Sequence, residues 1–158
     1  MIRSAVISPC GLYRYELRRE WVVRHSPLTS VAFIMLNPST ADGSVDDPTI
    51  RRCISFAKVW GFEALRVVNL FALRSTNPQA LLTASDPVGP DNQVYLDKAF
   101  AECSLVVAAW GAHAAAKRRG DALIRQFPEC RVLGKTKSGA PRHPLYLPKQ
   151  LNPLRIEW

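Results

Sequence analysis

The chain has 158 residues, of which 47% are hydrophobic and 22% are charged. This length suits one domain, and this composition excludes a wholly disordered chain and a collagen-like chain. With 21 Lys and Arg against 13 Asp and Glu, the formal net charge of +8 favours anionic partners such as nucleic acid or nucleotides. We expect a single domain over residues 1–158.

The cysteines and the N-terminal residues bear on cofactors and compartment. Cys10, Cys53, Cys103 and Cys130 form no CxxC or CxxH pair, which disfavours a zinc ribbon or a redox pair. The N-terminal residues lack the apolar stretch of a signal peptide, and no apolar run approaches the length of about 18 residues that a membrane span needs. We expect a cytoplasmic monomer with no membrane contact, no cofactor and no bound metal.

The first expected elements are strands. Residues 12–21 carry aromatic and charged side chains with partial period-two alternation, which predicts one or two antiparallel edge strands. Residues 31–36 form a short continuous apolar run, typical of a strand that is covered on both faces. That run ends at residues 37–40, which signal a loop.

A helix and a second buried strand follow this loop. An Asp at the capping position and Pro48 at the first helical position predict the helix start. Apolar side chains at three- and four-residue steps continue the helix to residue 60, and Gly61 ends it. Residues 65–70 then form the next apolar strand.

The second half of the chain continues the alternation of strands and helices. Residues 71–91 form a long loop with three prolines, and such loops are often functional. Helices are expected near residues 92–102 and over residues 112–127. Apolar strands are expected over residues 104–109 and 131–133.

This order of elements predicts the α/β class. Strands that alternate with helices form βαβ units and a mostly parallel sheet, and right-handed crossovers place helices on both faces. The expected fold is therefore a three-layer α/β/α domain. Its central sheet is four-stranded and mainly parallel, with an N-terminal antiparallel edge strand or hairpin.

Polar or aromatic side chains follow the carboxyl end of each expected strand. Asn37, Asn69 and Trp110 follow the first three, and the fourth leads to His143 ten residues later. In open α/β sheets, ligands bind outside the carboxyl ends of the strands. We therefore expect the two Asn side chains and the His to converge on one site, although Asn also ends strands because it favours turns.

These side chains suit a planar, neutral, polar ligand. An Asn amide has a donor and an acceptor for the edge of a nucleobase, and a His can donate to a carbonyl oxygen where negative charge develops. A carboxylate could polarise a water. Asp46 and Asp47 suit helix capping, so Asp42 is the better catalytic candidate, and a metal site built from all three is the alternative.

Basic residues cluster near the expected site. Arg51 and Arg52 open a helix, and Lys135, Lys137 and Arg142 share a loop with the histidine. All five are candidates for contacts to the phosphates of a nucleic acid.

Four short motifs over residues 31–147 resemble the uracil-DNA glycosylase superfamily in order and rough spacing. Residues 105–114 are similar to that superfamily's strand ending in a WGxxA step, and residues 143–146 are similar to its HP element. Residues 36–39 resemble its first motif, and residues 67–69 resemble the strand whose terminal Asn reads the base. A narrower resemblance, carried by MLNPSTAD, DDPTIRR, NLFALR, DPVGPDN, AAWG and RHPLYLP, is to a bacterial and phage family of unknown function, and it assigns no activity.

The superfamily resemblance implies hydrolysis of the N-glycosidic bond of a base that is flipped into a pocket. It implies that Asn37 positions the attacking water or contacts the sugar, with Pro38 and Ser39 beside it. It also implies that Asn69 reads the base edge and that His143 donates to the base carbonyl.

A stacking aromatic is also implied, for which Phe71, Trp110 and Tyr146 are candidates. The water-activating Asp of the most efficient members is Asn37 here, and an amide cannot act as a base, so we expect weak activity unless Asp42 helps. The superfamily's wedge loop is replaced by Leu145 and Tyr146. A modified base, a single strand or a free nucleotide is therefore as plausible a substrate as uracil in duplex DNA.

Three functions remain open at this point. The first is a glycosylase-like hydrolase of DNA repair or modification, acting on DNA rather than RNA, or on a nucleotide. The second is a non-catalytic nucleic-acid or nucleotide binding module on the same fold. The third is a metal-dependent phosphoester hydrolase that uses Asp42, Asp46 and Asp47.

Overall fold

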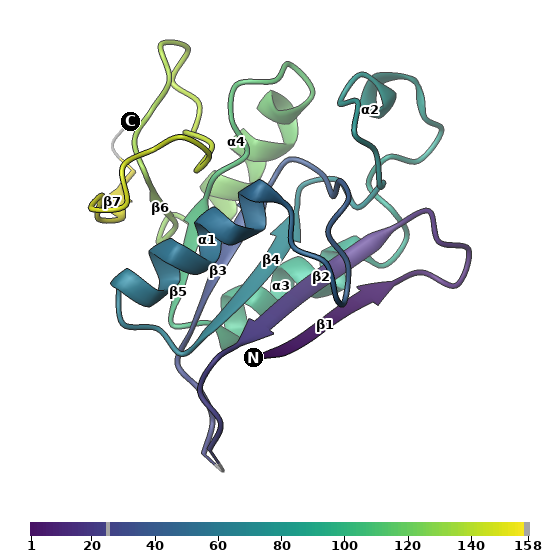
Figure 1. Ribbon diagram of the computed structural model, residues 1–158. Helices are drawn as coiled ribbons and strands as arrows, with labels where there is room; N and C mark the ends of the chain where they lie inside the picture. Colours follow the sequence, from purple (N-terminus) through teal and green to yellow (C-terminus); the bar gives the residue numbers. More distant parts are fainter. Residues whose placement is uncertain (25, 157–158) are drawn as a thin grey trace.

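A seven-stranded mixed sheet forms the centre of the computed structural model, which describes residues 1–24 and 26–156 (Figure 1). The strands lie in the order β1-β2-β4-β3-β5-β6-β7. Their bounds are β1 Ile2–Ile7, β2 Arg14–Glu20, β3 Ser30–Met35, β4 Ala64–Asn69, β5 Leu105–Ala108, β6 Arg131–Val132 and β7 Leu154–Arg155.

The sheet has more strands than predicted. β4, β3, β5 and β6 pair in parallel, whereas β1, β2 and β7 are antiparallel to their neighbours. The prediction of a mainly parallel four-stranded sheet is therefore wrong. The antiparallel part of the sheet consists of the N-terminal hairpin of β1 and β2, which pairs with β4, and of β7, which extends the opposite edge.

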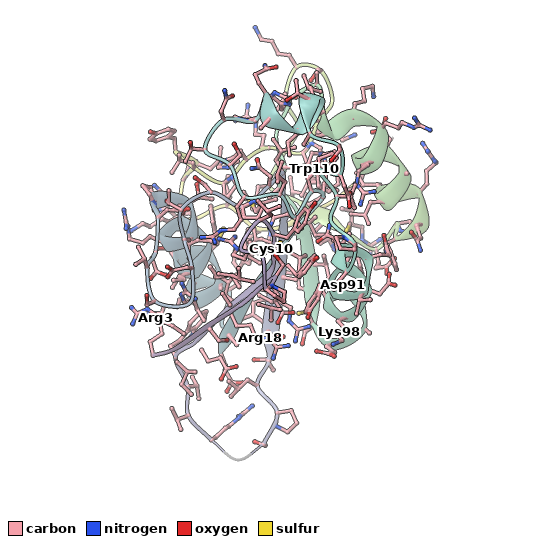
Figure 2. The ribbon with its side chains drawn as sticks, turned by 90° about the vertical axis from the view of Figure 1, so that its right-hand side faces the viewer. Arg3, Cys10, Arg18, Asp91, Lys98 and Trp110 are labelled. Atoms are coloured by element: carbon pink, nitrogen blue, oxygen red, sulfur yellow. The ribbon has the colours of Figure 1, made fainter. Side chains whose placement is uncertain are left out.

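Four helices lie among the described residues: α1 Pro48–Val59, α2 Ala80–Thr83, α3 Asn92–Glu102 and α4 Ala116–Gln126. α1 packs on one face of the sheet, and α3 and α4 pack on the opposite face. Figure 2 views the sheet nearly edge-on, with helices on both sides of it. The α/β class is thereby confirmed. None of these helices is long and apolar enough to cross a membrane.

Strand β3 shows why the apolar run of the sequence is continuous. Val31, Phe33 and Met35 belong to the core under α1, while Ala32 and Ile34 belong to the core under α3 and α4. Successive side chains of a strand point to opposite faces, so a strand with two covered faces needs apolar residues at every position. After this apolar strand the chain becomes polar at Asn37, which lies in the loop at the edge of the sheet.

The ends of α1 follow from local sequence. Asp47 accepts a hydrogen bond from the backbone N–H of Ile50 at 2.9 Å, and Pro48 is the first helical residue. Gly61, with φ of 82°, follows the helix in the left-handed region that glycine adopts at low cost. α4, by contrast, begins four residues later than predicted, because the Ala-rich segment before it contains no capping side chain to mark the start.

Candidate functional site

Side chains from distant parts of the sequence line one cavity of about 240 Å³ where the parallel strands end. Its wall contains Asn37 after β3, Asn69 at the end of β4, Trp110 after β5 and His143 from the loop after β6. The structure therefore brings together the two amides and the imidazole that the strand-end rule predicts to converge.

Asn69 presents a buried amide without a partner. Its side chain is 1% exposed, and neither Oδ1 nor Nδ2 has a hydrogen-bond partner among the described residues. Leaving a buried polar group unpaired costs roughly 1–3 kcal/mol, so such groups are uncommon in folded proteins. A ligand with one donor and one acceptor on the same edge satisfies both atoms.

Asn92 fixes the end of β4 and was missed by sequence reasoning. It is fully buried in α3, and its Nδ2 donates to the backbone carbonyls of Asn69 at 2.9 Å and Leu70 at 3.2 Å. A signal was available, because Asn92 shares the buried face of its helix with Leu96 and Ala99. A polar side chain on an apolar face needs a specific hydrogen-bond partner.

Asn37 holds the loop after β4. Its Nδ2 donates to the carbonyls of Pro38 at 3.0 Å, Leu73 at 3.3 Å and Ser75 at 2.9 Å. The donor side of the amide is thus occupied, and Oδ1 remains as the acceptor. Asn37 can accept a hydrogen bond from a water or a sugar hydroxyl, but it is not free to donate one.

His143 is held in one tautomer by the backbone. Its Nδ1 accepts a hydrogen bond from the N–H of Leu145 at 3.1 Å, so the neutral ring carries its proton on Nε2. Burial lowers the pKa of His143 below its ordinary value of 6.5, and the nearby Asp47 carboxylate acts in the opposite direction. At neutral pH the ring is therefore an uncharged donor.

The carboxylate in the cavity wall is that of Asp47. Although Asp47 caps α1, its side chain also lines the cavity. Asp42 lies outside the cavity wall, and its Oδ1 accepts hydrogen bonds from the N–H groups of Ser44 and Val45, which lower its pKa. The structure thus separates the preferred catalytic candidate of the sequence from the cavity and places its neighbour there.

The three acidic residues of this loop are engaged separately. Asp46 pairs with Arg19 at 2.7 Å and with Arg3 at 3.8 Å, while Asp42 and Asp47 cap a turn and a helix. In the part of the chain that the structure describes, no three His, Cys, Asp or Glu side chains gather as a possible metal site.

Of the three candidate stacking residues, Trp110 lines the cavity. Its indole packs on α4 so closely that a Cβ on Gly120 would lie 2.7 Å from the ring. Phe71 is buried in the core. The guanidinium carbon of Arg119 lies over its ring, 5.5 Å from the ring centroid. Tyr146 is 88% exposed and lies outside the cavity, with a φ of 68°.

Hydroxyl side chains add to the polar wall. Ser39 lines the cavity together with Thr49, Ser75 and Thr76. Pro38 is buried beside it, and its carbonyl accepts a hydrogen bond from the N–H of Ser75 at 3.0 Å. Pro38 thus supports the wall without lining it.

Arg14 was also missed by sequence reasoning. This first residue of β2 lines the cavity and is 3% exposed. Its segment has charged and aromatic residues in partial alternation, which predicts one or two antiparallel edge strands. β2 is an internal strand because β1 pairs with its outer edge, and the Arg14 side chain lies against the loop after β3, where it donates to the carbonyl of Ala41.

A basic surface groove lies beside the cavity. Arg51 and Arg52 of α1 line it together with Tyr146 and Lys149. The first turns of α1 contribute to both hollows, since Thr49 and Ile50 line the cavity while Arg51 and Arg52 line the groove.

The other predicted phosphate contacts lie on the loop before the cavity histidine. Lys135, Lys137 and Arg142 are exposed and do not belong to the cavity wall of the described chain. The Nε of Arg142 donates to the carbonyl of Lys135 at 3.3 Å, which ties the two arms of this loop together.

Comparison with protein families gives one informative match. A family described as "Protein of unknown function (DUF1643)" matches residues 14–145. This range begins at the cavity arginine and ends just after the cavity histidine, so it contains the whole cavity wall. No curated protein and no solved structure matches the chain.

Proposed function

The chain belongs to the DUF1643 family, whose description names no activity, and we propose from its cavity that it hydrolyses the N-glycosidic bond of a nucleobase. The observation that carries this proposal is the buried, unpartnered amide of Asn69 in a cavity that also contains an imidazole donor and a carboxylate. The resemblance of four motifs to the uracil-DNA glycosylase superfamily supports it. We also propose that the fold is related to that of the glycosylases and that the parallel strands β4, β3, β5 and β6 correspond to the central sheet of that superfamily.

The base binds against Asn69 and His143. The amide of Asn69 pairs with a donor and an acceptor on the base edge. The Nε2–H of His143 donates to a base carbonyl, where negative charge gathers as the bond to the sugar breaks. Trp110 forms an apolar wall of the same cavity.

The attacking water lies between Asp47 and Asn37. One carboxylate oxygen of Asp47 caps α1, and the other has no hydrogen bond among the described residues. As the water oxygen attacks the anomeric carbon, this carboxylate accepts its proton, and the Oδ1 of Asn37 orients the water. The electron pair of the glycosidic bond leaves with the base, which then takes up a proton.

The substrate is a base in a nucleic acid strand, and DNA is favoured over RNA. The groove of Arg51, Arg52, Lys149 and Tyr146 borders the cavity and offers both cations for phosphates and an exposed ring for a base. The net charge of +8 supports the same class of partner.

The test is incubation with single- and double-stranded oligonucleotides that carry a panel of altered bases, followed by mass spectrometry. We expect a released base and an abasic site from at least one oligonucleotide. His143→Ala should slow release by about 10²–10³, the effect of losing one oxyanion-type donor.

His113→Ala is the matched control for this variant. His113 also accepts a backbone N–H at Nδ1, from Ala115 at 3.1 Å, yet it lines a different hollow. Binding without any released base would replace the proposal with a non-catalytic binding module. Strand cleavage that EDTA abolishes would replace it with a metal-dependent phosphoester hydrolase.

A further inference from the structure

Arg14 is a buried cation with few partners. Its Nη1 donates to the carbonyl of Ala41 at 2.6 Å, and its Nε is buried without a hydrogen-bond partner. None of the ion pairs within residues 1–24 and 26–156 includes Arg14. Since its side chain lines the cavity, the remaining N–H donors are available to a ligand there.

The neighbouring Arg19 shows what a satisfied buried arginine looks like in this strand. It has no exposed surface, and its Nε pairs with Asp46 at 2.7 Å. Its two terminal nitrogens donate to carbonyls that include those of Arg18 and Asp42. Burying a charge is costly unless it is paired and hydrogen-bonded, and Arg14 lacks the pairing that Arg19 has.

Charged side chains of both signs act on the pKa of Arg14. The carboxylates of Asp47 and Asp42 act on it favourably, and the guanidiniums of Arg74 and Arg19 act on it unfavourably. Burial lowers the pKa of Arg14 to about 10, so the side chain is still protonated at neutral pH.

We propose that Arg14 binds an oxyanion of the substrate, either a carboxylate or a phosphate, inside the cavity. A guanidinium matches both groups because its planar N–H donors pair with two oxygens at once. The inference deepens the proposed function and rests on the same cavity being the substrate site. It narrows the substrate to a base that carries an acidic group or to a nucleotide whose phosphate enters the cavity.

Thermal melting of the full chain with small oxyanions tests this inference. Sodium phosphate and sodium acetate are compared with sodium chloride at equal ionic strength. We expect one of the two oxyanions to raise the melting temperature by about 3–6 °C beyond chloride at ten times its dissociation constant. The more effective anion identifies the group, and no rise beyond chloride from either anion overturns the inference.

Variants locate the bound anion. Arg14→Met should abolish the anion-specific rise, and Arg125→Met, in the last turn of α4, should keep it. Asn69→Asp, a nearly isosteric change that adds a negative charge to the cavity wall, should also abolish the rise, and it serves if Arg14→Met does not fold. A wild-type response in a folded Arg14 or Asn69 variant places the anion elsewhere and overturns the inference.

The failure of this inference is distinguishable from the failure of the proposed function. Melting requires no turnover, so an anion-specific rise without any released base contradicts the glycosylase proposal alone. Base release from neutral substrates, without any anion-specific rise, contradicts the role of Arg14 alone.

Discussion

The Nδ2 of Asn92 donates to the backbone carbonyl of Asn69 at 2.9 Å, while the side-chain amide of Asn69 has no partner among the described residues. One buried asparagine thus fixes the strand end on which the other presents its amide to the cavity. The Nδ2 of Asn92 stabilises the fold through its two hydrogen bonds, whereas both polar atoms of the Asn69 amide are left for a ligand.

Replacement of Asn69 by leucine should raise stability while it abolishes base binding. Asn69→Leu removes two unpartnered buried polar atoms, each of which costs roughly 1–3 kcal/mol, and keeps a side chain of similar shape. We expect a higher free energy of unfolding in urea denaturation than for the wild type. A loss of stability would show that the amide has structural partners.

Replacement of Asn92 by alanine should have the opposite effect on stability. Asn92→Ala removes two hydrogen bonds to the backbone of Asn69 and Leu70 and leaves a small cavity in a fully buried place. We expect a loss of about 1–3 kcal/mol in the free energy of unfolding. An unchanged urea midpoint would mean that the end of β4 does not depend on this side chain.

The parallel centre of the sheet could be predicted from sequence, whereas its margins could not. β3, β4 and β5 are covered on both faces, and their residues other than Ser30, Arg66 and Asn69 are apolar. The outer strands β1 and β7 are largely exposed, so their side chains carry no such pattern. Because β1 could not be predicted from its sequence, its partner β2 could not be recognised as an internal strand. The burial of Arg14 at the start of β2 could not be predicted either.

The candidate site could be predicted where a topological rule applies. Asn37, Asn69 and His143 follow strand ends, and parallel strands bring such positions together whatever their separation in sequence. Asp47 was assigned to helix capping, which is correct, but a capping residue can also face a cavity. The position of Arg14 in the cavity wall depends on the order of the strands in the sheet, and no local sequence pattern encodes that order.

Protonation of His143 should destabilise the fold at mildly acid pH. Its pKa in the folded chain lies below the ordinary value of 6.5, because burial disfavours the charged ring. Between these two values the unfolded chain binds more protons than the folded chain, so the free energy of unfolding falls as the pH decreases below 6.5. The uncharged His143 ring therefore makes its full contribution to the free energy of unfolding above pH 6.5.

Urea denaturation at pH 7.5 and pH 5.5 checks this prediction. The fall in stability between the two values should be smaller in His143→Gln than in the wild type, and His113→Gln serves as the control. An equal fall in His143→Gln and the wild type would contradict burial of an uncharged ring.

The groove beside the cavity should contribute phosphate contacts. The double variant of Arg51→Gln and Arg52→Gln should bind single-stranded DNA with a shallower dependence of affinity on salt. Each lost phosphate contact lowers the slope of log affinity against log salt by about 0.7. Fluorescence anisotropy at several salt concentrations measures the slope, with Arg125→Gln as the control. An unchanged slope would place the nucleic acid on another surface.

The rate of base release under single turnover tests the central claim most directly. It is measured on the best oligonucleotide of the panel for the wild type, Asn69→Ala and Asn152→Ala, whose wild-type side chain is exposed in the C-terminal segment. We predict that Asn69→Ala slows release by about 10²–10³ and that Asn152→Ala keeps the wild-type rate. A wild-type rate in Asn69→Ala, or the failure of the wild type to release any base from the panel, would contradict the account.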